Sequence, residues 1–122
     1  MSNTTGFRNL FELQQHYEDH GADVGANSER DYLAMADALW IDPKPPHIHE
    51  CRHRRDGDLV RYDPIAETMG VVDNKSTLRT FFKPIPCSSI AAINDQALMR
   101  RAGKCHPFAD NLEYFRVRCG RQ

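Results

Sequence analysis

The chain has 122 residues, of which 40% are hydrophobic and 27% charged, and its formal net charge at pH 7 is −1. This is the length and composition of one ordinary globular domain, so we expect a single domain over residues 1–122. No apolar run approaches the roughly 20 residues of a membrane span, and the N-terminus lacks the basic and apolar regions of a signal peptide. We therefore expect neither of these segments.

Two helices are predicted between about residues 7 and 41. The first is indicated by an apolar stripe at helical spacing, and either Gly21 or Gly25 can end it. The second begins after Ser28, an N-cap residue followed by Asp31 in an acidic variant of the capping box. It ends at the segment DPKPP from Asp42, because proline removes a backbone donor and disfavours helix before it. The stripe of the first helix consists of Phe7, Leu10, Phe11, Leu13 and Tyr17.

The sequence period changes from helical to alternating over about residues 47–84. The segments HIHECRHR, DLVRYD, MGVVD and TLRTFF are rich in strand-forming residues and are separated by short turn-like stretches. Asp56-Gly57 is a strong hairpin signal between the first two. We therefore predict an α+β fold, in which the N-terminal helices pack on a small, about four-stranded antiparallel meander sheet.

Residues 85–122 are the least regular part of the sequence. We predict a third helix over residues 89–102, ending at Gly103, and a final strand in EYFRVRC, which starts at Glu113.

The four cysteines are widely spaced and form no C-x-x-C pair, which argues against a zinc ribbon or a thioredoxin-like motif. An even number permits two disulfides, but without a secretion signal we expect reduced thiols. The cysteines are Cys51, Cys87, Cys105 and Cys119.

Charge is distributed unevenly along the chain. Residues 1–50 contain three basic and nine acidic side chains, a net charge of −6, whereas residues 51–122 contain thirteen basic and eight acidic ones, a net charge of +5. Either the second part presents a basic surface suited to a polyanion, or the two parts neutralise each other across their interface.

Three groups of residues carry potential chemistry, and the first is the alternating run His47, His49, Cys51 and His53. In a strand these side chains share one face, and such a set can bind zinc if enough ligands are correctly placed. The same stretch, CRHRR, equally suits a basic strand that contacts phosphate.

The second group is the pair His16 and His20, one helical turn apart. The sequence H-Y-E-D-H differs from H-E-x-x-H, so the metalloprotease motif is absent. The pair is either part of a solvated helix face or a site of proton transfer. The carboxylates of Glu18, Asp19 and Asp23 would raise the basicity of a histidine that they approach.

The third group lies in RTFFKP, at the end of the fourth predicted strand. Thr80 and Phe82 would share one face, with Arg79, Phe81 and Lys83 on the other. A hydroxyl beside an aromatic ring and flanking cations is typical of a subsite for phosphate and a nucleobase. Alternatively, both phenylalanines belong to the core and the threonine is only a strand former.

In their order along the chain, these segments resemble toxin domains of the barnase–EndoU–colicin–RelE ribonuclease superfamily, of the colicin D-like or polymorphic-toxin type. The resemblance covers about residues 7–84. It rests on H-x-x-x-H-G-x-x-x-G, S-x-x-D-Y-x-x-M-A, DGD-x-x-R-Y-D-P, GVVD and L-R-T-F-F-K-P.

The resemblance implies a set of site residues. His20 matches the family's catalytic histidine, and Thr80, Phe82 and Lys83 match its hydroxyl, aromatic and lysine on the last strand. One departure is Asp19, where family members often have a lysine. The remaining candidates are Arg61, Arg79 and the arginines of residues 52–55 for phosphate, His16 as a second proton carrier, and Tyr114 as a phenol donor.

The implied activity is that of a metal-independent endoribonuclease, an antibacterial toxin domain that cleaves tRNA or another structured RNA. The 2′-OH of the RNA attacks the adjacent phosphate and leaves a 2′,3′-cyclic phosphate. No cofactor is implied, and the partners are RNA and a cognate immunity protein. We expect a monomer, delivered as an effector that acts in the cytoplasm of a target cell.

Two other interpretations remain open. The chain could be a non-catalytic RNA- or partner-binding module of the same fold. It could also be a zinc-binding protein that uses the run from His47 to His53.

Overall fold

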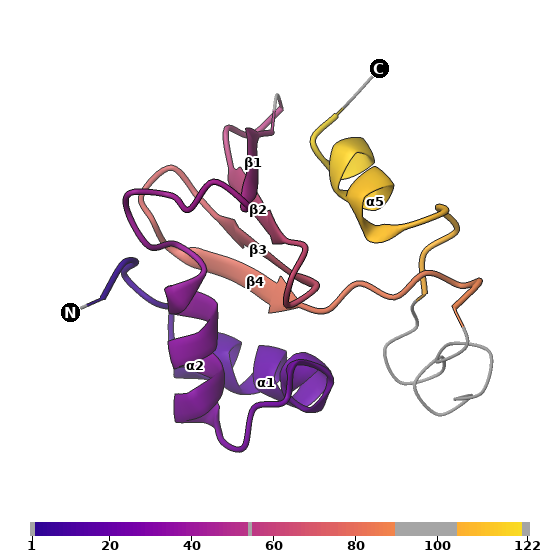
Figure 1. Cartoon of the computed structure of the whole chain (residues 1–122). Coiled ribbons are helices and arrows are strands. Elements are labelled where there is room, and N and C mark those ends of the chain that lie inside the picture. Colours follow the sequence, from indigo (N-terminus) through magenta and orange to yellow (C-terminus); the bar gives the residue numbers. More distant parts are fainter. Residues whose placement is uncertain (1, 54, 90–104, 121–122) are drawn as a thin grey trace.

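The computed structural model describes residues 2–53, 55–89 and 105–120 (Figure 1). Four of its strands form one antiparallel sheet in the order β1-β2-β3-β4, and helices precede and follow it. The predicted α+β fold with a four-stranded antiparallel meander is confirmed, whereas the single domain over residues 1–122 stays a prediction. The elements are α1 (Leu10–Val24), α2 (Glu29–Ala38), β1 (His49–Arg52), β2 (Leu59–Asp63), β3 (Thr68–Val72), β4 (Leu78–Phe82) and α5 (Asn111–Arg118).

Local side-chain chemistry sets the ends of the first two helices. Asn9 caps α1, and Gly25, with a φ of 82°, ends it in the left-handed conformation that glycine adopts without strain. The predicted N-cap of α2 is confirmed, because the Ser28 side chain accepts a hydrogen bond from the Asp31 N–H at 3.0 Å. The Asp31 carboxylate in turn accepts from the N–H of Asn27 at 2.9 Å.

The apolar stripe predicted for α1 is only partly buried. Leu13 lies in the core, but Leu10 and Phe11 are 71% and 63% exposed. They occupy the first turn of a helix that begins at Leu10, and the side of α1 that faces the protein continues from Leu13 to Tyr17 and Gly21. Neither α1 nor another helix in the described ranges combines the length and apolar character that crossing a membrane requires.

The two faces of the sheet are covered by different helices (Figure 1). On one face, α1 and α2 bury a core that includes Tyr32, Trp40 and Phe81, and the Tyr32 hydroxyl donates to the Phe81 carbonyl. On the other face, a smaller cluster of strand residues surrounds Phe115 of α5. The strand residues of this second cluster are Val60, Tyr62, Met69 and Val71.

The segment EYFRVRC is helical, so the predicted final strand is wrong. Asp110 accepts a hydrogen bond from the Glu113 N–H at 2.8 Å and starts α5, and Arg116 and Arg118 lie in its last turn, where cations favour a helix end. These local signals outweigh the strand preference of its tyrosine, phenylalanine and valine. The helix predicted over residues 89–102 lies, apart from Ser89, outside the described residues.

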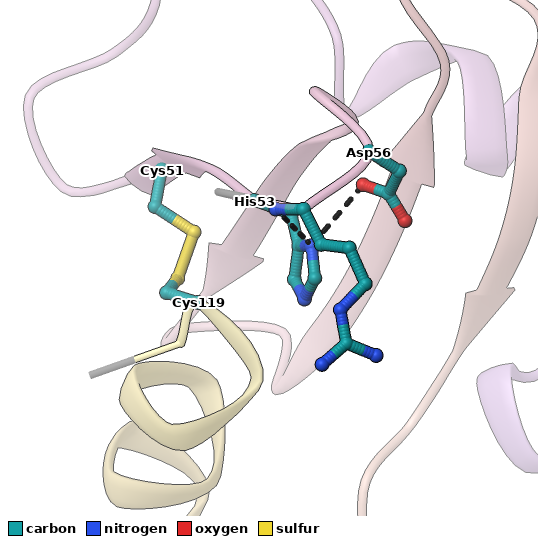
Figure 2. Close-up of a disulfide and its surroundings, with 5 residues drawn as sticks. Cys51, His53, Asp56 and Cys119 are labelled. Atoms are coloured by element: carbon teal, nitrogen blue, oxygen red, sulfur yellow. Dashed lines mark hydrogen bonds and ion pairs between the residues drawn. A yellow bond between two sulfur atoms is a disulfide. The ribbon is translucent and has the colours of Figure 1, made fainter. Parts of the chain in front are cut away.

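The four cysteines form two disulfides, which corrects the expectation of reduced thiols. Cys51 of β1 is bonded to Cys119 at the end of α5 (Figure 2), and Cys87 is bonded to Cys105. The fold brings the paired Cα atoms to 6.0 and 4.7 Å, distances that permit the bonds. The sequence carried no information about these distances, since the first pair is 68 residues apart.

Candidate active site

A cavity of about 410 Å³ lies where the C-terminal half of α1, the end of β4 and α5 meet. Five of the residues predicted for the site line it, although they come from three separate parts of the chain. The predicted residues in the cavity wall are His20, Thr80, Phe82, Lys83 and Tyr114.

The pairing of β4 explains which of its side chains reach the cavity. Thr80 pairs with Val71 and Phe82 with Met69, so both side chains lie on the face of the sheet that α5 covers. Phe81 points the other way and is 2% exposed in the core under the helices. Phe82 is half-buried and its ring centre lies 5.7 Å from that of His20. His20 and Thr80, which are 60 residues apart in the sequence, thereby line the same cavity.

Aromatic contacts continue from Phe82 into α5. The Phe82 and Tyr114 rings meet edge to face at 6.4 Å. The guanidinium of Arg118 lies over the Phe82 ring at 5.5 Å, and its Nη1 donates to the Tyr114 hydroxyl at 3.2 Å. An imidazole, a hydroxyl and a phenol therefore surround an aromatic ring with a fixed cation above it.

The cavity holds charges of both signs. Lys83 is exposed at its rim and Arg118 lies in its wall, whereas Asp19 and Asp23 flank His20 on α1. Cations at these places can bind phosphoryl oxygens, and the carboxylates oppose a dense negative ligand.

Two cavity residues whose side chains could bind or transfer protons were missed from the sequence. Arg118 was missed because no sequence motif connected it with the site; in the helix, Tyr114 and Arg118 are four residues apart and share one face. The signal that could have revealed this is Asp110 followed three residues later by Glu113, an acidic capping pattern. His106 also lines the cavity, in a stretch without any recognisable motif.

His16 is close to the cavity but does not line it. Its ring stacks on Phe7 at 5.1 Å and lies 6.0 Å from the ring of His20. Burial lowers the pKa of His16, and the charges of Glu12 and Asp19 act in the opposite direction with smaller effect. The carboxylate of Asp19 therefore acts on the pKa of His16 in the expected direction, but burial outweighs it.

Arg61 and Arg79, predicted to bind phosphate, are not brought to the cavity. Arg61 is buried on the face covered by α1 and α2, where its Nε lies 2.6 Å from Glu50 and its Nη1 donates to two carbonyls at the end of α2. It pairs across the sheet with Gly70, in line with Phe81. Arg79 forms an ion pair with Asp58 at 3.3 Å. Both arginines are engaged in the structure of the sheet.

The run from His47 to His53 does not form the zinc cluster considered above. Cys51 is bonded to Cys119, so its sulfur is not available as a thiolate ligand. His53 turns to Asp56 at 3.2 Å in the adjacent turn (Figure 2), and His47 pairs with Asp63 at 3.7 Å. In the described ranges, no three His, Cys, Asp or Glu side chains are placed to hold a metal ion.

No family model and no curated protein sequence matches the chain. Among solved structures, one similar chain is a ribonuclease from Escherichia coli in complex with its inhibitor protein. It is 18% identical, with a TM-score of 0.43, and the alignment covers 75% of this chain and 98% of that one. A likeness of this size leaves the activity to be inferred from the cavity itself.

Proposed function

We propose that this protein is a metal-independent endoribonuclease. The observation that carries the proposal is the placement of His20, Thr80, Phe82 and Lys83 on one open cavity. RNA contains its own nucleophile, the 2′-OH, so cleavage needs only proton transfer and stabilisation of a charged phosphorane. The products are a 2′,3′-cyclic phosphate and a 5′-hydroxyl.

Six of the cavity residues have a role in this reaction. His20 transfers a proton, and the Thr80 hydroxyl donates to a phosphoryl oxygen. Lys83 and Arg118 offset the negative charge that develops on the phosphorane. Phe82 stacks on a base beside the cleaved bond, as aromatic rings do in single-stranded RNA sites. Tyr114 adds a phenol that donates to phosphate.

The substrate we propose is tRNA or another structured RNA with an exposed single-stranded loop. The cavity has one ring for a base and two cations beside Asp19 and Asp23, so its own attraction for phosphate is limited. An RNA that presents its cleavage site in a fixed loop needs less binding energy at the cavity to order the strand.

The biological role we propose is that of an antibacterial toxin domain. It would act as a monomer in the cytoplasm of a target cell and be restrained in the producing cell by an immunity protein. The ordered sequence motifs between His16 and Pro84 support this role. An immunity protein would inhibit by covering the cavity, and its acidic side chains would pair with Lys83 at the rim and Arg118 in the wall.

A non-catalytic RNA- or partner-binding module is the second candidate. The observation that favours it is the pair Asp19 and Asp23, whose negative charges lie in the cavity wall beside the proposed catalytic histidine. Such a module would bind at the same cavity and leave RNA intact.

The test is incubation of purified protein with total RNA in EDTA, followed by mapping of fragment ends and assay for cyclic phosphate. His20→Ala should lower cleavage by roughly 10²- to 10⁴-fold, the usual contribution of a general acid or base. His47→Ala, at an exposed histidine outside the cavity, is the matched control and should cleave like wild type. Intact RNA after incubation with the wild-type protein would favour the binding module.

A further inference from the structure

The end of α5 lies beside the turn between β1 and β2, because a disulfide joins the two elements. The Cα atoms of Cys51 and Cys119 are 6.0 Å apart, and Figure 2 shows His53 and Asp56 of the turn next to this bond. Arg52 and Arg118 are the immediate chain neighbours of the two cysteines. The fold therefore brings the basic segment around Arg52 close to the basic end of α5.

Arg118 connects this turn with the proposed active site. It lines the large cavity together with His20 and Lys83, and it also lines a second cavity of about 140 Å³ at the turn. His53 and Asp56 belong to the wall of the second cavity. Since one guanidinium is common to both cavities, an RNA strand that leaves the active site past Arg118 reaches the turn.

Two arginines beside the second cavity have charges that are available to a ligand. Arg52 ends β1 and Arg55 lies in the turn, and both side chains are exposed. In the described part of the chain, neither guanidinium forms an ion pair. Nη1 of Arg52 donates to the Gly57 carbonyl at 2.8 Å, so this side chain is already oriented and loses less freedom on binding. The guanidinium presents a fork of donors that suits phosphate oxygens.

The carboxylates of the turn are engaged within it. Asp56 lies 3.2 Å from Nδ1 of His53 and accepts a hydrogen bond from the Asp58 N–H at 3.1 Å. Asp58 is buried and pairs with Arg79 at 3.3 Å. Because Arg79 offsets Asp58, the two arginines of the preceding paragraph and Arg118 face one remaining carboxylate, that of Asp56. This surface is therefore positive, whereas the wall of the large cavity holds charges of both signs.

We propose that Arg52, Arg55 and Arg118 form a phosphate-binding surface that extends the active site along the backbone of a structured RNA; this inference rests on the proposed function. Asp19 and Asp23 limit the attraction of the cavity for phosphate, and the arginine surface supplies the missing affinity. Phosphate contacts position an RNA without reading its bases. The surface thus favours a long, folded RNA such as tRNA over a dinucleotide, which occupies only the cavity.

The first test measures the Kd for tRNA between about 50 and 200 mM salt, in the His20→Ala background so that the RNA stays intact. Each lost phosphate contact makes the plot of log Kd against log salt shallower by about 0.7–0.9, so Arg52→Gln/Arg55→Gln should reduce the slope by roughly 1.4–1.8. Binding at low salt should weaken roughly 10- to 100-fold.

The matched control is Arg8→Gln/Arg30→Gln, which removes the same charge from exposed positions in the helical part of the chain. It should keep a slope close to that of the His20→Ala protein. If the Arg52→Gln/Arg55→Gln protein, with an unchanged melting curve, has the same slope and affinity as the control, the surface does not contact RNA and the inference is overturned.

The second test compares cleavage of tRNA with cleavage of a dinucleoside phosphate in the wild-type background. Arg52→Gln/Arg55→Gln should lower kcat/KM on tRNA roughly 10- to 100-fold, mainly by raising KM, and should change kcat/KM on the dinucleotide by no more than about twofold. Equal losses on both substrates would overturn the inference. Wild-type protein that cleaves neither substrate refutes the proposed function, whereas a reduced salt slope for tRNA binding would still support the arginine surface. A wild-type protein without affinity for tRNA overturns both.

Discussion

The two faces of the sheet are stabilised in different ways. The face covered by α1 and α2 has an extended apolar core, in which Tyr32 and Ala36 are fully buried and Tyr32 bonds to the backbone of β4. The face covered by α5 has a smaller cluster around Phe115, and a disulfide ties the end of α5 to β1 (Figure 2). One helix layer is held by burial, and the other by a small core together with a covalent bond.

The cavity takes residues from both layers. His20 comes from a helix that the large core holds, whereas Tyr114 and Arg118 come from α5. Changes in the large core should therefore act mainly on the stability of the whole protein, and changes around α5 should also act on the geometry of the site.

The adjacent pair Phe81 and Phe82 gives the largest contrast between the faces. Phe81→Ala empties a buried position and should lower the free energy of unfolding by about 3–5 kcal/mol. Phe82→Ala removes a half-buried ring and should cost less stability, but it should weaken RNA binding by roughly 1–3 kcal/mol per stacked base. Denaturant unfolding and binding to a 2′-deoxy oligonucleotide separate the two effects. Equal losses of stability in the two variants would contradict the different burial of these rings.

Removing the disulfide between Cys51 and Cys119 should have the next largest effect. The double serine variant releases a loop of 68 residues, and the loop-entropy model gives a stability loss of about 4 kcal/mol. Cleavage should also fall, because Tyr114 and Arg118 lose the anchor at the end of their helix.

The matched variant replaces Cys87 and Cys105, which are 18 residues apart, and the same model gives about 3 kcal/mol. Denaturant midpoints with and without reductant measure both bonds, and the serine variants should not respond to reductant at the bond they lack. A Cys51→Ser/Cys119→Ser protein with wild-type stability and cleavage would show that packing of Phe115 alone holds α5.

Within α5, Arg118→Gln tests the site without disturbing the anchor. It removes a charged donor to phosphate, the contact with the Phe82 ring and the bond to Tyr114. The fall in kcat/KM should correspond to a loss of about 1.5–3 kcal/mol of transition-state stabilisation. Arg116→Gln, two residues earlier in the same helix and exposed, is the control. If the two variants lose activity equally, the effect belongs to the general charge of α5 and not to the cavity.

The contrast between the faces also separates what the sequence could predict from what it could not. The strands were predictable because alternating β-formers and the Asp56-Gly57 turn are local signals, and Ser28 marked α2 for the same reason. Thr80 and Phe82 could be assigned to one face because side chains alternate along a strand.

The other layer depends on distant partners. The pairing of Cys51 with Cys119 requires the fold, and α5 was mistaken for a strand because its aromatic and branched residues also suit a sheet. Arg61 looked like a free cation, yet its neighbours Val60 and Tyr62 face α5, which leaves it under the helices with Glu50. Whether a charged side chain on a strand is buried or exposed to solvent can be decided only when the elements that cover the sheet are known.

The smallest predicted effect is a pH dependence of stability that arises from His16 of α1. Burial lowers the pKa of His16 below 6.5, so between its folded pKa and 6.5 the unfolded chain binds more protons than the folded one. Stability is then highest above pH 6.5 and falls as the pH drops through that value. In His16→Gln this part of the loss disappears, so the change in melting temperature between pH 7.5 and pH 5.5 should be smaller than in wild type. His47→Gln, whose ring pairs with Asp63 at the surface, controls for removal of a histidine as such. The same pH dependence in His16→Gln and wild type would mean that the protonated ring is accommodated beside Glu12 and Asp19, and that burial against Phe7 does not dominate.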